Sequence, residues 1–445
     1  MNWLRKVLTF PLQWWANNRL DRIMLGGLMG LLIVGLVAQS SVTQGHFFNK
    51  HLLYLALGIP IFLIGYSIPT ETLRKTSWIW YGVAVTLLVL VLVKGTSALG
   101  AQRWIAIGNF SLQPSEPAKL AVILALANWF YLRKPKSIFD FILAGGLVLL
   151  LPFGLILIQP DLGTAMILAS LFISISFWAG ALPAQILIIL SPLLVMLLSA
   201  LGPHFLGFKA FKIGTHLIEP GCSWLGLLFI VATIIYLGWE YKVKNFPKRQ
   251  LALGIFCLAL LGIGFLGRPL VWGSLEPYQQ KRLTTFLDPG KDRLGAGWNI
   301  YASLMSVGSG RLKGQGYKDG YLTQGSFVPE QHTDFIFSSI AEEWGFIGSS
   351  LLILLFGMVC FRVLRVISQI ENNFERLLGA GILTFFWVHV SVNIGMNIGL
   401  LPVTGVPLPF ISYGGTSLWV SLISLGIIQR IYVSNFEQVM FKNKI

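Results

Sequence analysis

Charged residues are scarce in this sequence. Only 11% of the residues are Asp, Glu, Lys or Arg, whereas 55% are hydrophobic. A water-soluble domain of ordinary composition carries roughly a quarter charged residues. This deficit excludes a soluble globular enzyme. Long uncharged runs, such as 83–93 and 142–158, approach the roughly 20 apolar residues that a helix needs to cross a bilayer. The composition therefore predicts a protein that spans a membrane several times.

Cysteine is also scarce, and histidine is scattered. The three cysteines are Cys222, Cys257 and Cys360, and no CxxC pair exists. This excludes a disulfide framework and a thiolate zinc site. The six histidines form no cluster. The sequence therefore specifies no cofactor with certainty, and a divalent cation at an anion-binding site stays open as an alternative.

The apolar runs predict the fold class. No segment shows the ten-residue alternation of a membrane strand, so we expect an all-α, polytopic membrane protein. The predicted spans, about twelve in number, are 24–43, 51–68, 77–95, 116–132, 139–158, 162–181, 184–202, 223–240, 250–272, 334–363, 376–400 and 412–432.

Basic residues mark one side of the predicted spans. Arg74 and Lys75 follow the second span, Lys134 follows the fourth, and Arg362 closes the tenth. Cytoplasmic loops carry an excess of Lys and Arg. This pattern predicts a multi-pass protein of the plasma membrane with both termini in the cytoplasm. The net charge of +15 comes mostly from such loops, so no nucleic-acid partner is expected.

The loop 273–333, between the ninth and tenth spans, is predicted on the outer side and breaks this charge rule. An excess of cations there suits an anionic ligand. Its length also indicates function, because connections this long are uncommon. We expect 1–445 to form one transmembrane domain, in which 203–272 is an insertion that adds two spans. The cations of the loop are Lys281, Arg282, Lys291, Arg293, Arg311, Lys313 and Lys318.

Two charged residues begin the predicted span 116–132. Glu116 and Lys119 are three residues apart, which places them on one helical face. Charges at membrane depth are costly and are functional candidates. Ser115 suits an N-cap and Pro117 suits a first helical turn. Two interpretations stay open: a capped helix start with an internal ion pair, or the polar wall of a cavity.

Other polar residues lie at the ends of spans. Asp161 is expected to cap the span that follows it, and Thr333 or Asp334 to cap the tenth. Glu342 and Glu343 lie two to three turns inside that span, which favours a site or a polar network over simple packing. The segment 393–417 mixes glycine and proline with apolar residues, which predicts a broken helix that lines a cavity.

One acidic residue of the outer loop has a setting that suits catalysis. Asp292 lies between Lys291 and Arg293 in a glycine-rich stretch, and Trp104 lies in another outer loop. A carboxylate beside a site for an anionic leaving group suits a general base that acts on a hydroxyl. Asp288 is the local rival, although Asp-Pro is typical of a turn.

Six motifs in a fixed order resemble the SEDS family, which includes RodA, FtsW and SpoVE. The blocks that contain HTDFIF and PLPFISYGG are the most specific. The similarity runs from the first to the last predicted span, apart from 203–272. The motifs read GAQRWI, QPSEPAKL, QPDLGTA, FLDPGKDRLGAGW, VPEQHTDFIFSSIAEEWGFIG and GVPLPFISYGGTS.

The resemblance implies a bacterial inner-membrane enzyme with a core of about ten spans that polymerises lipid II into glycan strands. In this chemistry a sugar hydroxyl attacks the lipid-linked disaccharide with inversion, a β-1,4 bond forms and undecaprenyl pyrophosphate leaves. The essential carboxylate falls on Asp292. Trp104 matches a functionally important tryptophan, and Glu116 and Lys119 match a polar pair. The implied partners are membrane lipids, lipid II and a class B penicillin-binding protein, which is a transpeptidase.

Further substrate-binding candidates follow from the same motifs and from charge. They are Arg103, Arg282, Lys291 and Arg293 for the pyrophosphate, and His332, Asp334, Glu342 and Ser412 in the two most specific blocks. Arg293 stands where the family usually has proline. The match is closest to RodA, the member that acts in cell elongation. The alternatives are a division polymerase of the FtsW type and a lipid II flippase.

Overall fold

The computed structural model describes residues 20–43, 46–98, 101–108, 110–135, 137–183, 185–186, 189–190, 211–213, 216–218, 280, 285–286 and 297–442. The chain divides into two compact units. One unit comprises Met1–Gly180 and Trp298–Ile445, and the other comprises Ala181–Gly297. The described residues of the second unit include an antiparallel pair of short strands, β4 (Phe211–Ile213) and β5 (His216–Ile218). The predicted insertion 203–272 otherwise lies outside the described residues and stays a prediction.

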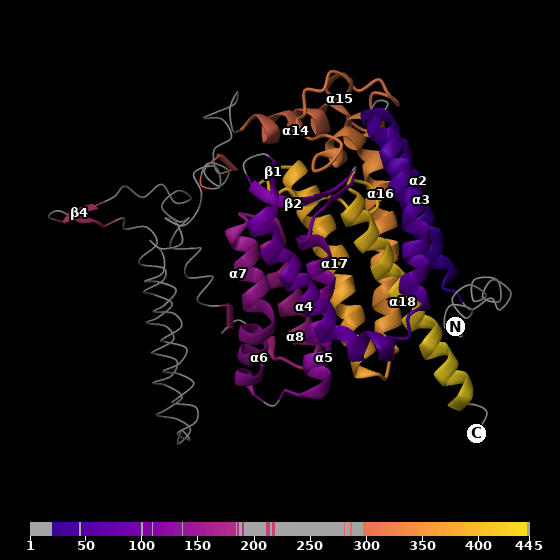
Figure 1. Cartoon of the computed structure of the whole chain (residues 1–445). Coiled ribbons are helices and arrows are strands. Elements are labelled where there is room, and N and C mark those ends of the chain that lie inside the picture. The colour runs from indigo at the N-terminus through magenta and orange to yellow at the C-terminus, as the bar shows by residue number, and fades with distance from the viewer. Residues whose placement is uncertain are drawn as a thin grey trace, which may run out of the picture. The chain divides into compact units, whose positions relative to one another are not determined.

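The first unit is a bundle of helices (Figure 1). Within the described part of the chain, seven helical stretches are long and apolar enough to cross a membrane. The polytopic α-helical architecture is therefore confirmed. The helices are α2 (Arg22–Val42), α3 (His46–Ser67), α4 (Thr70–Lys94), α5 (Ser115–Leu132), α6 (Ile138–Ala144), η1 (Gly145–Leu149), α7 (Leu150–Ile158), α8 (Leu162–Trp178), α14 (Trp298–Ser309), α15 (Tyr321–Gln324), α16 (Ile336–Ser368), α17 (Asn373–Asn397) and α18 (Gly415–Lys442).

The predicted spans agree with these helices wherever the structure describes them. Nine of the twelve overlap a helix, although α4 begins seven residues before its predicted span and α18 ends ten residues after its own. The fifth span corresponds to α6, η1 and α7 together. The remaining three, at 184–202, 223–240 and 250–272, fall largely or wholly outside the described residues. Long uncharged runs fix these positions because a lipid-facing backbone must satisfy its own hydrogen bonds within a helix.

The connection between α4 and α5 contains strands that the sequence pattern did not predict. β1 (Thr96–Ala98), β2 (Ala101–Ile107) and β3 (Phe110–Leu112) form a three-stranded antiparallel sheet in that order. Such short strands give too few residues for an alternating pattern to be visible. The sheet lies at the same end of the bundle as α14 and α15, opposite the turn between α16 and α17 (Figure 1). Because β3 runs into α5, the sheet fixes where the first turn of α5 begins.

Helix α16 breaks at Gly345, whose φ of 67° and ψ of −164° are not helical. The loop after α14 fills the break with backbone hydrogen bonds. The N–H groups of Phe346 and Ile347 donate to the carbonyls of Arg311 (2.9 Å) and Leu312 (3.1 Å). In return, the N–H of Gln315 donates to the carbonyl of Glu342 at 2.9 Å. The loop therefore replaces the helical bonds that the break removes. Helix α14 itself was not predicted, because its twelve residues were assigned to the long outer loop.

Candidate functional site

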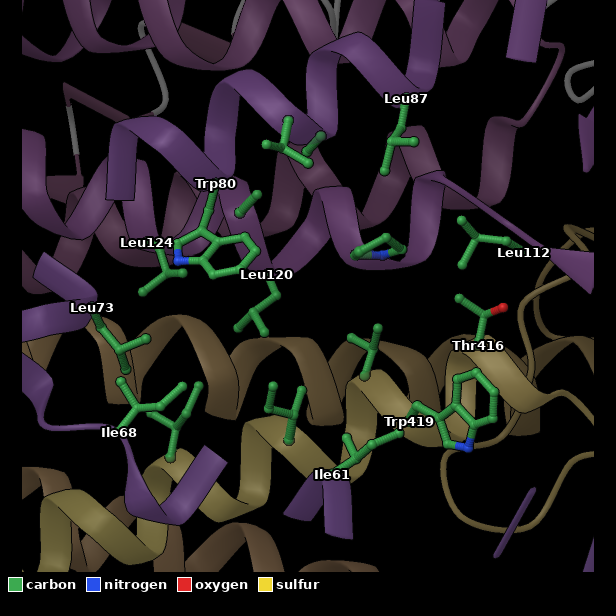
Figure 2. A pocket seen from close by; sticks show the side chains of 17 residues that line it. Ile61, Ile68, Leu73, Trp80, Leu87, Leu112, Leu120, Leu124, Thr416 and Trp419 are labelled. Carbon is green, nitrogen blue, oxygen red and sulfur yellow. The ribbon is translucent and has the colours of Figure 1, made fainter. Parts of the chain in front are cut away.

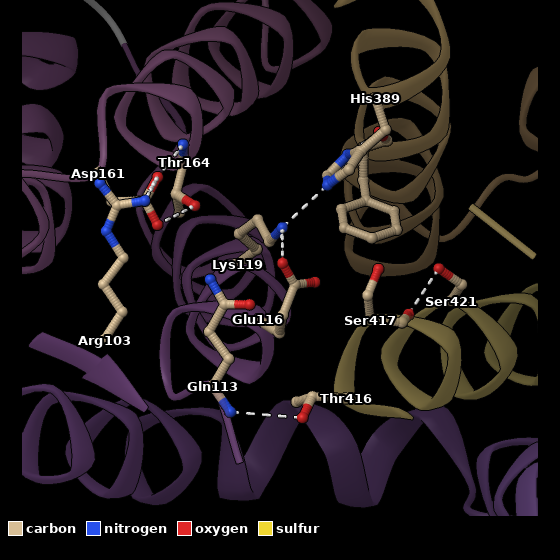
Figure 3. Close-up of polar contacts among 11 residues, drawn as sticks. Arg103, Gln113, Glu116, Lys119, Asp161, Thr164, His389, Thr416, Ser417 and Ser421 are labelled. Carbon is tan, nitrogen blue, oxygen red and sulfur yellow. Dashed lines mark hydrogen bonds and ion pairs between the residues drawn. The ribbon is translucent and has the colours of Figure 1, made fainter. Parts of the chain in front are cut away.

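A buried triad of ionisable side chains joins α5 to α17. The ammonium of Lys119 lies 2.7 Å from Glu116 Oε1 and 2.8 Å from His389 Nε2 (Figure 3). Glu116 and Lys119 are each 1% exposed, and His389 is fully buried. An ammonium can only donate, so His389 Nε2 accepts and the ring is neutral. Its Nδ1 then carries the proton and donates to the carbonyl of Phe385 at 2.7 Å.

Polar atoms at the start of α5, in the triad and beside it, retain unused hydrogen-bonding capacity. In the described part of the chain, neither Glu116 Oε2 nor the Ser115 hydroxyl has a hydrogen-bond partner, and both are buried. The prediction that Ser115 caps α5 is wrong, because Pro114 occupies the N-cap position and no side chain caps the helix. The predicted ion pair is confirmed, whereas the predicted cavity wall stays a prediction. Buried polar atoms without partners are expected to bind water or a substrate hydroxyl.

Arg103 on β2 contacts the turn before α8. Its Nε donates to the carbonyl of Gln159 at 3.1 Å, its Nη2 donates to the carbonyl of Pro160, and its Nη1 lies 4.0 Å from Asp161 Oδ1. Asp161 caps α8 as predicted, since its carboxylate accepts from the N–H of Thr164 at 3.2 Å. Arg103 therefore ties the sheet to this turn, which favours a positioning role over direct contact with pyrophosphate. The adjacent Trp104 is partly buried.

The start of α18 is tied to the start of α5. Thr416 Oγ1 accepts from the N–H of Gln113 at 3.3 Å (Figure 3). It also donates to the carbonyl of Ser111 at 3.3 Å. The motif that ends in GGTS therefore meets the motif QPSEPAKL, although about three hundred residues separate them. The contact is made three residues before Glu116, at Gln113, whose carbonyl accepts from the Glu116 N–H at 3.1 Å.

The predicted break in 393–417 is confirmed: the chain between α17 and α18 is not helical, and every residue of it except Leu400 is buried or partly buried. The segment holds the backbone of the turn before α16. Ser412 Oγ donates to the carbonyl of Thr333 at 2.6 Å, and the N–H of Tyr413 donates to that of His332 at 2.8 Å. The structure therefore brings the predicted residues His332 and Ser412 together.

Asparagines of α17 hold Asp334 by its main chain. Asn393 Nδ2 and Asn397 Nδ2 donate to the Asp334 carbonyl at 2.8 and 3.1 Å. Neither Thr333 nor Asp334 caps α16, because Phe335 occupies the N-cap position. That prediction was wrong because the two asparagines bind the Asp334 carbonyl, and the N-cap position falls on Phe335 instead. The spacing of His389, Asn393 and Asn397, four residues apart on one face of an apolar helix, is the signal that sequence reasoning missed.

The His332 side chain belongs to an aromatic cluster. Its ring lies 5.4 Å from Phe47 and 5.6 Å from Tyr413, centre to centre. Burial lowers the pKa of His332, and the nearby Glu330 carboxylate opposes this only partly. We therefore expect a neutral imidazole at pH 7, which is suited to hydrogen bonding rather than to holding a phosphate.

Glu342 and Glu343 are buried as predicted, and they form a polar network. Glu342 accepts hydrogen bonds from the N–H groups of Leu322 (2.8 Å) and Thr323 (2.9 Å), and also from the Ser306 and Thr323 hydroxyls. Glu343 accepts from the Ser41 hydroxyl and from Gln324 Nε2. These bonds anchor the outer loop to α2 and α16. They favour a structural role for Glu342 over substrate binding.

Four predicted site residues lie outside the described residues, namely Asp292, Arg282, Lys291 and Arg293. The rival Asp288 also lies outside them. Their roles stay predictions. Among the residues that the structure describes, no three His, Cys, Asp or Glu side chains gather as they would to hold a metal ion.

An apolar hollow of about 380 Å³ lies between α3, α4, α5 and α18 (Figure 2). Pro117, Leu120 and Leu124 line it from one face of α5. Glu116 and Lys119 lie on the neighbouring face of the same helix, since residues three or four apart share a face. One helix therefore separates an apolar hollow from a buried ion pair.

These features define a class: a multi-pass membrane protein with a buried polar site at its loop-bearing end and an apolar hollow beside it. The chain belongs to the FtsW/RodA/SpoVE family, because the model of that family, described as cell cycle protein, matches residues 19–206 and 203–437.

Named relatives and solved structures resemble the chain over most of its length. It is 32% identical to peptidoglycan glycosyltransferase RodA of Treponema pallidum, covering 92% of this chain and 97% of the relative. It is also 32% identical to peptidoglycan glycosyltransferase MrdB of Escherichia coli, with 94% and 95% covered. A chain from a peptidoglycan synthase complex that coordinates polymerization and crosslinking superposes with a TM-score of 0.68 at 26% identity, with 94% and 99% covered. RodA of Thermus thermophilus shares the fold, with a TM-score of 0.59 at 23% identity over 95% and 99% of the two chains.

Proposed function

We propose that this protein is a peptidoglycan glycosyltransferase that polymerises lipid II into glycan strands during cell elongation. The observation that carries the proposal is the similarity to RodA and MrdB, both named as such enzymes, across more than nine-tenths of the chain. The order of the motifs and the buried triad on α5 and α17 support it.

The proposed chemistry uses the outer loop. Asp292 takes the proton from the acceptor hydroxyl, whose oxygen attacks the anomeric carbon of the donor. Undecaprenyl pyrophosphate leaves as the glycosidic bond forms with inversion. Arg282, Lys291 and Arg293 stabilise the diphosphate, because cations placed where negative charge develops lower the barrier.

The described residues provide a place for an amphiphilic donor. The apolar hollow beside α5 accommodates part of a polyprenyl chain, with α5 between that chain and the ion pair. At the first turn of α5, Glu116 Oε2 and the Ser115 hydroxyl retain hydrogen-bonding capacity, which suits a sugar hydroxyl. The Lys119 ammonium donates to Glu116 Oε1, which orients the carboxylate.

A membrane setting and a partner accompany this function. We place the protein in the bacterial inner membrane with both termini in the cytoplasm, because the short loops at one end of the predicted spans carry the excess of Lys and Arg that is typical of cytoplasmic loops. We also propose a class B penicillin-binding protein as the partner that crosslinks the product. The resemblance to a chain from a complex that combines polymerization with crosslinking supports this assignment.

Asp292→Ala is expected to abolish polymer formation by the purified protein with labelled lipid II. Removing a general base costs typically 10²–10⁴-fold in rate. Asp288→Ala is the matched control, since it removes a carboxylate four residues away and should retain most of the activity. If Asp292→Ala polymerises as fast as the parent, the base assignment fails.

The same preparation distinguishes a polymerase from a flippase. Proteoliposomes that scramble labelled lipid II across the bilayer, yet never form polymer even with the transpeptidase present, would contradict the proposed activity. Restoration of rod shape rather than septation in a depleted host would distinguish elongation from division.

Leu120→Trp is expected to slow polymerisation several-fold with little loss of stability. The larger side chain fills the apolar hollow and so competes with the lipid chain. Leu143→Trp is the control, because Leu143 is 46% exposed on α6 and does not line the hollow. The measurement is the initial rate at several lipid II concentrations, where a raised KM is expected. Equal effects of the two substitutions would argue against a chain in the hollow.

A further inference from the structure

A second crevice lies on a different part of the bundle, between α14, α16 and α17. Its volume is about 270 Å³, and none of its lining residues lines the hollow beside α5. Phe346, Ile353, Ile394 and Ile398 form apolar walls. Phe346 and Ile353 are 66% and 44% exposed, so the crevice opens on the lipid-facing surface of α16.

The crevice begins at the break in α16. The second part of the helix starts after Gly345, so its positive dipole end lies at the break. The loop after α14 reaches this point, and Arg311 lines the mouth of the crevice. Arg311 adopts a φ of 50°, unusual for a residue other than glycine. The hydrogen bond from the Phe346 N–H to its carbonyl holds it there.

Two polar side chains at the crevice lack the partners that they would ordinarily have. In the part of the chain that the structure describes, Arg311 forms none of the ion pairs. Ser349 lines the crevice one turn into the helix and is 7% exposed, and its hydroxyl has no hydrogen-bond partner among the described residues. A buried hydroxyl without a partner destabilises the folded protein, because its hydrogen bonds to water are lost and not replaced. A ligand that accepts a hydrogen bond would remove this cost.

We propose that this crevice binds one anionic phospholipid of the outer leaflet. The headgroup phosphate pairs with the Arg311 guanidinium at the mouth, which is the geometry that guanidinium and phosphate favour. One acyl chain lies against Phe346, Ile353 and Ile394, and the Ser349 hydroxyl donates to an ester or phosphate oxygen. The apolar walls select a lipid over free phosphate, and the cation selects an anionic headgroup over a zwitterionic one.

The bound lipid would brace the outer loop. Arg311 and Leu312 supply the carbonyls that complete the break in α16, and the following residues bond to the carbonyls of Glu342 and Glu343. A phosphate on Arg311 therefore stabilises the same loop that the buried carboxylates anchor. This inference is independent of the proposed enzymatic activity.

Thermal unfolding of the delipidated full-length protein in neutral detergent tests the proposal. Added phosphatidylglycerol should raise the unfolding temperature by several degrees, whereas phosphatidylcholine and inorganic phosphate at equal concentration should not. Arg311→Gln should weaken phosphatidylglycerol binding about tenfold or more, since charge-assisted hydrogen bonds contribute most to such sites. Ser349→Ala should weaken it several-fold while leaving the lipid-free protein as stable as the parent or more so.

Lys313→Gln is the matched control. It removes the same charge from the same loop, but Lys313 does not line the crevice, so the parental response to phosphatidylglycerol should persist. An equal response to both phospholipids, a response to inorganic phosphate alone, or an unchanged response in Arg311→Gln would each overturn the proposal. If Arg311→Gln alters the lipid-free unfolding temperature, equilibrium binding of labelled phosphatidylglycerol to the folded variant decides.

Discussion

Lys119→Met is expected to destabilise the protein and to abolish polymer formation. The substitution leaves the Glu116 carboxylate and His389 Nε2 without their shared donor, in a site where all three side chains are at most 1% exposed. Removing one partner of a buried ion pair typically costs about 3–5 kcal/mol. The measurements are the thermal unfolding midpoint in detergent and the rate of glycan synthesis from lipid II.

A double variant separates stability from activity. Glu116→Gln combined with Lys119→Met replaces the pair by neutral side chains of similar size, and such replacements are often neutral for stability. We expect the unfolding midpoint to recover most of its loss while polymer formation stays absent. If the single variant is as stable as the parent, the pair is not the buried interaction described above. If the double variant polymerises normally, the triad serves the fold alone.

Gly345→Ala should release the outer loop from α16. The residue has a φ of 67° and a ψ of −164°, a region that is essentially restricted to glycine. An added Cβ would lie 2.3 Å from the nitrogen of Gly314 and 2.7 Å from the carbonyl oxygen of Leu312. The strain and the displaced hydrogen bonds together should cost about 3 kcal/mol or more. Hydrogen exchange at Phe346 and Ile347 should accelerate, and the unfolding midpoint should fall.

Gly357→Ala on the same helix is the control. Among the described residues, no atom beyond the neighbouring helix backbone lies within 4 Å of the position that its Cβ would take. Alanine is the better helix former by about 0.5–1 kcal/mol, so this variant should match or exceed the parent in stability. If Gly357→Ala lowers the unfolding midpoint as much as Gly345→Ala, then α16 tolerates no added methyl group. The effect at Gly345 would then not be specific to the break.

The described spans and the buried charges were predictable because each leaves a local signal. A run of about 20 apolar residues indicates a span wherever it occurs. Glu116 and Lys119 at a spacing of three indicate a shared helical face, and the structure confirms their ion pair. The Asp161 cap followed from the preference of acidic side chains for a helix start.

Other features depend on contacts that no local pattern encodes. The third member of the triad, His389, lies 270 residues from Lys119. Ser115 looks like a cap but is buried without a partner, because β3 and Pro114 set the start of α5 instead. The strands β1 to β3 and helix α14 are too short to be distinguished from a loop by periodicity.

The sequence by itself determined a membrane bundle, its family and which residues carry charge at membrane depth. Burying a charge or an unpaired backbone group in lipid is so costly that spans are long apolar runs, in which each charged residue stands out. The tertiary structure alone decided how these residues are used. In the folded protein, Lys119 contacts His389, and Glu342 binds the backbone of the loop before α16. Arg103 lies beside the turn that contains Asp161, and α16 is broken at Gly345. These outcomes depend on which helices pack together, and packing is a property of pairs of distant segments.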